Sequence, residues 1–82
     1  TMARVNATYG GLNSDLADPV LFQSTDADIK RWVTEAIQSG SMPGMPADPD
    51  CDLTDYVIDR FEASDIRPYH LLIARAKTPF GK

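Results

Sequence analysis

One amphipathic helix constrains the fold more than any other feature of the sequence. In the stretch STDADIKRWVTEAIQSG (24–40), apolar residues recur at the i, i+3, i+4, i+7 and i+8 spacing of a single helical face. Thr25 is a favourable N-cap residue, and Gly40 is a natural stop just after the last turn. A helix with one apolar face must bury it against another element. The stripe consists of Ile29, Trp32, Val33, Ala36 and Ile37.

Two segments before the helix have the composition of strands. Residues 3–9 (ARVNATY) alternate apolar and polar side chains, which is the period of a half-buried strand. Gly10-Gly11 interrupts this pattern, and the apolar run at 19–23 (PVLFQ) follows it. The sequence therefore predicts a hairpin of these two strands, joined by a long loop through Asn13-Ser14-Asp15.

Two further segments after the helix complete the predicted fold. Residues 55–61 fit either a strand or a helical face, and their β-branched and aromatic content favours a strand. Residues 69–77 predict a strand with Leu71 and Ile73 on one side and Leu72 and Ala74 on the other. The order β-β-α-β-β predicts an α+β domain in which one helix packs on one face of a mixed four-stranded sheet. The right-handed crossover rule places a strand after the helix parallel to the first strand.

Length and charge limit the classes of function. The 82 residues predict a single domain spanning 1–82, and the net charge is −4. The eight basic residues are scattered, which disfavours a nucleic-acid or anionic-membrane surface. The single cysteine forms no internal disulfide, and neither a signal-peptide pattern nor a transmembrane-length apolar run is present. A cytoplasmic protein without membrane contact is therefore expected.

Four short motifs resemble the ubiquitin-like β-grasp family over roughly residues 25–75. TDADIK (25–30) is similar to that family's Thr-capped helix, and MPGMPAD (42–48) to the proline turn that follows it. LTDYVI (53–58) resembles a Leu-Ser-Asp-Tyr segment of ubiquitin, and YHLLIAR (69–75) resembles its last strand. The resemblance implies a β-grasp fold with the element order predicted above.

The C-terminus departs from the modifiers and sulfur carriers of that family. Those proteins end in Gly-Gly, whereas this chain ends in Phe80-Gly81-Lys82. Conjugation or thiocarboxylate chemistry would therefore require processing that exposes the C-terminal glycine. A processed modifier or sulfur carrier remains the alternative to a non-enzymatic interaction module.

Residues that could hold a metal or perform catalysis do not match a known pattern. Asp48, Asp50 and Asp52 begin like a calcium loop, but Leu53 stands where the turn glycine belongs and Asp59 where the bidentate glutamate belongs. Cys51 and His70 are the only thiol and imidazole, and their spacing matches no zinc or nucleophile motif. We therefore expect no cofactor, no metal and no enzymatic activity.

Met42, Met45 and Phe80 are the residues that the sequence favours for binding a protein partner. The two methionines lie in a proline-rich loop, where flexible thioethers suit adaptable contacts, and burial under the end of the helix is the competing interpretation. Phe80 lies in the C-terminal tail. An exposed sheet face or the edge strand at 55–61 is a further expected contact surface.

Overall fold

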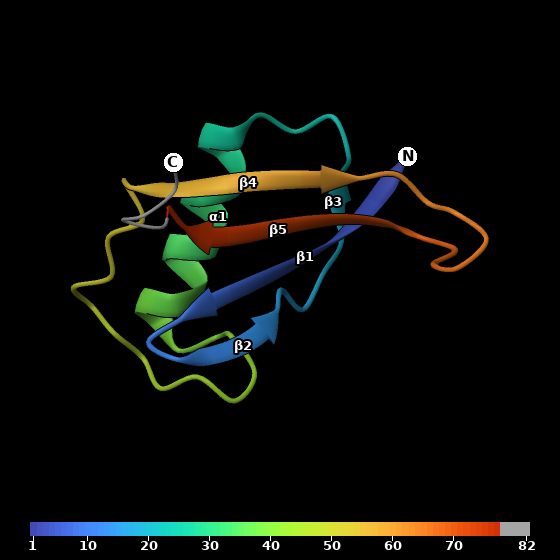
Figure 1. The fold of residues 1–82 in the computed structure, drawn as a ribbon. Helices are drawn as coiled ribbons and strands as arrows, with labels where there is room; N and C mark the ends of the chain where they lie inside the picture. The colour runs from blue at the N-terminus through green and yellow to red at the C-terminus, as the bar shows by residue number, and fades with distance from the viewer. Residues whose placement is uncertain (78–82) are drawn as a thin grey trace.

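The computed structural model describes residues 1–77 and shows an α+β fold with one helix and a mixed sheet of five strands (Figure 1). The helix lies behind the sheet in this view, and the opposite sheet face points toward the reader. The elements are β1 (Met2–Tyr9), β2 (Leu12–Asp15), β3 (Val20–Leu21), α1 (Asp26–Ser39), β4 (Tyr56–Phe61) and β5 (His70–Ala76).

Helix α1 begins and ends where the sequence predicts. The Thr25 side chain accepts a hydrogen bond of 3.1 Å from the backbone N–H of Asp28, and Gly40 closes the helix in the left-handed conformation with φ 79°. Ile29, Val33 and Ile37 are buried against the sheet. Trp32 and Ala36 are half-buried at the border of the same face. The apolar stripe of the helix is therefore only partly covered by the sheet.

The strand order β2-β1-β5-β4 places the first and last strands side by side in the centre of the sheet. They pair in parallel, with Val5 opposite Leu72 and Ala7 opposite Ala74, and β4 flanks β5 in antiparallel pairing. The predicted parallel pairing and the strand character of 55–61 are thereby confirmed. The parallel pair requires a crossover connection, which α1 supplies behind the sheet.

The predicted hairpin is wrong in its loop and its second strand, and the sheet has five strands instead of four. Gly10 and Gly11 have φ of 58° and 79°, so they form a two-residue turn that pairs Tyr9 directly with Leu12. Residues 13–15, expected in a loop, belong to β2, and the 19–23 strand is reduced to β3. Strands β2 and β3 both pair with β1 along the same edge, because the chain leaves the sheet between them.

The buried core lies between α1 and the inner face of the sheet. Alternate residues of β1 and β5 meet the buried helix face, as the strand periodicity requires. Residues from the loop after α1 cover this core at the C-terminal end of the helix. The buried side chains are Ala3, Val5, Ala7, Ile29, Val33, Ile37, Met42, Met45, Cys51, Leu53, Leu72 and Ala74.

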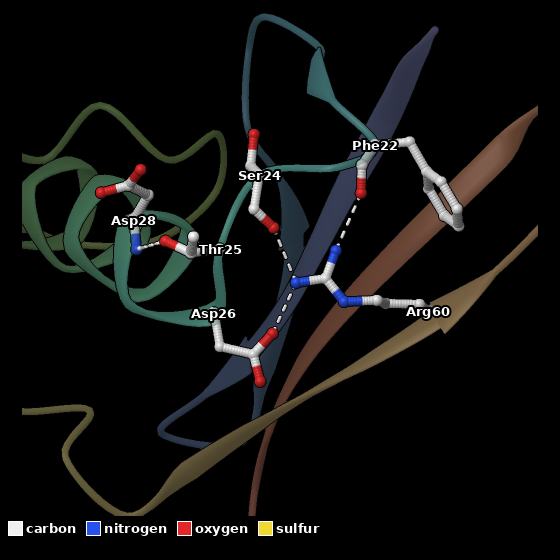
Figure 2. A network of polar contacts seen from close by, with 6 residues as sticks. All are labelled: Phe22, Ser24, Thr25, Asp26, Asp28 and Arg60. Atoms are coloured by element: carbon white, nitrogen blue, oxygen red, sulfur yellow. Dashed lines mark hydrogen bonds and ion pairs between the residues drawn. The ribbon is translucent and has the colours of Figure 1, made fainter.

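Arg60 of β4 connects the sheet to the chain that enters the helix (Figure 2). Its guanidinium donates hydrogen bonds of 2.8 Å to the carbonyl of Phe22 and 2.7 Å to the carbonyl of Ser24. It also pairs with the carboxylate of Asp26 at 2.5 Å, in the first turn of α1. The planar guanidinium can satisfy all three acceptors at once, so it fixes the start of the helix over the sheet.

Replacing Gly40 by alanine is expected to lower the free energy of unfolding by about 2 kcal/mol. The left-handed backbone strains a side chain, and the added Cβ would lie 3.1 Å from the Cβ of Ala47. Gly44→Ala is the matched control, because Gly44 has φ 76° but no atom near the added Cβ. Urea denaturation of both variants measures the difference. Equal losses would show that the contact with Ala47 carries no cost.

Candidate functional site

The structure does not present the two methionines predicted to bind a partner. Met42 is 1% exposed and Met45 is 6% exposed, and both pack in the core. The Ser14 hydroxyl donates to the carbonyl of Pro43 at 2.5 Å, which fastens this loop to β2. The methionines are buried because a single helix does not cover the part of the sheet beside its C-terminal end, and the two thioether side chains fill this space. Phe80 lies outside the described residues.

The aspartates after the helix hold the loop together instead of converging on one point. Asp48 accepts hydrogen bonds from the Tyr9 hydroxyl at 2.5 Å and from the Asp50 backbone at 3.0 Å. Asp52 accepts from the backbone and the hydroxyl of Thr54. These bonds lower the pKa of the Asp52 carboxyl below its usual value. Within residues 1–77, no group of three or more His, Cys, Asp or Glu side chains is arranged to hold a metal ion.

Tyr9 and Cys51 both have raised pKa values at this end of the core. The hydrogen bond to the Asp48 carboxylate raises the pKa of Tyr9 far above its ordinary 10.0, and burial raises the pKa of the Cys51 thiol above 9.0. Both groups are therefore held in their neutral forms. A thiol with a raised pKa is a poor nucleophile at neutral pH, so this cluster has the properties of a structural element.

These shifts predict lower stability in alkaline solution. The unfolded chain loses the Cys51 and Tyr9 protons at their ordinary pKa values, whereas the folded chain retains them to higher pH. The stability that these two neutral groups contribute to the folded state is thus complete below about pH 9 and is lost as pH rises beyond it. Urea midpoints measured from about pH 7 to pH 11 should fall above pH 9. Tyr9→Phe should reduce the decrease, and an unchanged pH profile in this variant would contradict the role of Tyr9.

His70 lies far from Cys51 and faces the helix side of the sheet, not solvent. It pairs with Ala3 near the start of β1 and stacks on the ring of Phe22 with centroids 4.6 Å apart. Its Nδ1 accepts a 2.8 Å hydrogen bond from the backbone N–H of Ala63. Cys51 lies beside Tyr9, and Tyr9 is six positions from Ala3 along β1, or about 20 Å. The thiol and the imidazole therefore form no catalytic pair.

The most extensive candidate surface is the sheet face opposite α1, which we call the open sheet face. Strand register assigns its strand residues, because their side chains alternate with the buried ones on each strand. Tyr69, just before β5, is included because its ring stacks with Arg4. No described element covers this face (Figure 1). Its members are Met2, Arg4, Asn6, Thr8, Asn13, Asp15, Leu21, Val57, Asp59, Phe61, Tyr69, Leu71, Ile73 and Arg75.

Leu71 and Ile73 occupy the middle of the open sheet face, and Phe61 continues this apolar area onto the edge strand β4. Arg4, Leu71 and Phe61 follow one another across β1, β5 and β4, and Ile73 lies on the next row. Phe61 is 42% exposed, and the two aliphatic residues are half-buried by their neighbours. Sequence alternation identified Leu71 and Ile73 as a common face, but no local signal shows that this face lacks a covering layer.

Stacked arginines and aromatic rings border this apolar centre. The guanidinium of Arg4 lies 4.0 Å above the centroid of the Tyr69 ring. The guanidinium of Arg67 lies 5.6 Å from the Phe61 ring and 5.9 Å from the Tyr69 ring, and it donates to the carbonyls of Tyr69 and Glu62. Such stacking orients the cations and partly removes water from them.

Most of the remaining side chains of the open sheet face are polar and hydrogen-bonded to one another, whereas Met2, Leu21 and Val57 are apolar. Asn6 and Asn13 exchange two side-chain hydrogen bonds of 2.9 Å across β1 and β2, and Asn6 also donates to Asp15. On the other side, Arg75 pairs with Asp59 at 2.5 Å. These polar groups satisfy one another, whereas the apolar side chains of this face and the Arg4 guanidinium remain available for contacts with a partner.

Hollows elsewhere on the surface are modest in size. One of about 380 Å³ lies between α1 and the loop after it, with Lys30, Cys51 and Asp52 in its lining. Another of about 280 Å³ lies between Pro19 and Trp32, and a third of about 300 Å³ lies beside Leu12 and Pro46. Small-molecule sites usually have volumes of about 300–1,000 Å³ with a few converging polar groups. In the hollows beside Trp32 and Pro46, Asp18 and Asp48 are the only ionisable lining residues apart from Tyr9. The hollow beside Lys30 contains the Cys51 thiol, whose raised pKa makes it a poor nucleophile at neutral pH.

Comparisons with models of known families, with curated proteins and with solved structures find no match. Helix α1, the one helix of residues 1–77, is not long and apolar enough to cross a membrane.

Proposed function

We propose that this protein is a non-enzymatic interaction module of β-grasp type that binds a protein partner through the open sheet face. The observation that carries the proposal is the combination of a half-exposed apolar centre with oriented arginines on a sheet face that no described element covers. Protein interfaces commonly have such an apolar centre with aromatic residues and arginine around it.

The architecture supports this location over the loop after α1. A sheet with one helix has one covered face and one free face. Here the free face carries Leu71 and Ile73 on the central strand β5 and Phe61 beside Leu71 at the end of the edge strand β4. The central parallel strands and the single crossover helix agree with a β-grasp arrangement. The loop has its methionines in the core and its aspartates in internal hydrogen bonds.

Peptides selected from a random displayed library against the whole chain test this proposal. We expect amide chemical-shift changes from a selected peptide to concentrate on β5, β4 and the first half of β1. Ile73→Thr should weaken binding by at least about tenfold, because it removes apolar contact area but retains a β-branched side chain. Glu35→Gln, on the exposed side of α1, is the control and should leave affinity unchanged. Shifts confined to the helix or the loop after it would contradict the proposal.

A further inference from the structure

We propose that Arg4 is the charged anchor of the open sheet face and that it receives a carboxylate from an acidic, apolar segment of the partner protein. This inference rests on the proposed function and adds the chemistry of the partner. Its basis is a cation that is oriented by stacking but has no ion-pair partner among the described residues.

The geometry of Arg4 sets it apart from the other arginines of the chain. Arg31, Arg60 and Arg75 each pair with an aspartate, and Arg67 donates two hydrogen bonds to backbone carbonyls. Arg4 makes none of these contacts with residues 1–77. Its guanidinium carbon lies 4.0 Å from the centroid of the Tyr69 ring, which holds the cation against the ring while its N–H groups stay available.

The surroundings of Arg4 define what a ligand must carry. Leu71 lies directly opposite Arg4 in the register, and Phe61 lies opposite Leu71, so an apolar strip begins beside the cation. Asp15 lines the same small hollow as Arg4, but its carboxylate accepts a hydrogen bond from Asn6 and forms no ion pair. A ligand that spans both features needs a carboxylate next to apolar side chains.

A carboxylate suits this position better than another cation or a neutral group. The guanidinium binds carboxylates through two parallel N–H donors, and a stacked guanidinium loses little conformational entropy on forming them. Nucleic acid also binds stacked arginines, but the net charge of −4 disfavours a polyanion with many charges. One acidic side chain within an apolar segment pairs with Arg4 and brings a single negative charge to a face that also carries Asp15 and Asp59, whereas a polyanion would bring many.

Sequences and affinities of the selected library peptides test this inference. We expect enrichment of Asp or Glu beside apolar residues, and at least about tenfold weaker binding to Arg4→Gln by fluorescence anisotropy. Arg4→Lys should restore part of the affinity, because it keeps the charge but not the two-pronged donor geometry. Arg31→Gln is the control, since Arg31 is an exposed arginine of α1 and should not affect binding.

Other results would disprove either the carboxylate anchor alone or the proposed function as well. Peptides that bind the open sheet face without acidic residues, or that bind Arg4→Gln equally well, disprove the carboxylate anchor and leave the proposed function standing. No selected peptide, or binding elsewhere, disproves both. Tighter binding of a single-stranded oligouridine probe than of the acidic peptides, lost in Arg4→Gln, would replace the protein partner with a nucleic acid.

Discussion

The Met42→Asp variant is expected to be largely unfolded at neutral pH. Met42 is 1% exposed and lies in the core between α1 and the sheet. The substitution removes a packed thioether and places a carboxylate in the hydrophobic core, which together cost roughly 5 kcal/mol or more. That loss is comparable with the whole stability of a small domain, about 5–15 kcal/mol.

Met2→Asp is the matched control for this prediction, because the same substitution is made at a side chain that is 51% exposed. Its free energy of unfolding should change by less than about 1 kcal/mol. Circular dichroism and urea denaturation distinguish the two variants directly. A folded Met42→Asp protein with nearly unchanged stability would show that Met42 lies at the surface, as the sequence-based binding prediction requires.

The Arg60→Ala variant is expected to lose about 2–3 kcal/mol of unfolding free energy. The guanidinium of Arg60 bonds the carbonyls of Phe22 and Ser24 and the carboxylate of Asp26, so one truncation releases the start of α1 from β4. The Arg60 side chain is 32% exposed, which makes these bonds stronger than those of a fully solvated pair.

Arg60→Lys separates the geometry of the guanidinium from its charge, and Arg31→Ala is the control for an exposed ion pair. Arg60→Lys should recover less than half of the loss, because an ammonium group cannot reach all three acceptors in one plane. Arg31→Ala, which breaks the exposed pair with Asp28, should cost less than about 1 kcal/mol. Thermal or urea denaturation measures all three. An Arg60→Ala loss as small as that of Arg31→Ala would contradict a structural role for this network.

Local signals in the sequence were sufficient for the helix and for the two strands after it. Thr25, Gly40 and the apolar spacing act within one or two turns, so the boundaries of α1 follow from nearby residues. The same holds for β5, where alternating side chains separate Leu72 and Ala74 from Leu71 and Ile73. The hairpin failed because Gly10-Gly11 was interpreted as a break, although two residues with positive φ form a tight turn.

The candidate surface could be predicted only in part. Alternation places Leu71 and Ile73 together, and the general expectation of an exposed sheet face agrees with the structure. The stack of Arg4 on Tyr69 joins residues 65 positions apart, and only the parallel pairing of β1 and β5 brings them together. The sequence left both binding and burial open for the two methionines, because a thioether in a proline-rich loop has the same local sequence whether it is exposed or buried, and the structure agrees with burial.

The sequence by itself determined the elements whose cause is local: one capped amphipathic helix, strands of period two, and a parallel contact that follows from the crossover rule. Only the tertiary structure decided which face of the sheet stays uncovered, which side chains fill the end of the core, and which arginine has no ion-pair partner among the described residues. The physical reason is that burial and charge pairing depend on residues far apart in the chain, whereas periodicity and capping depend on neighbours.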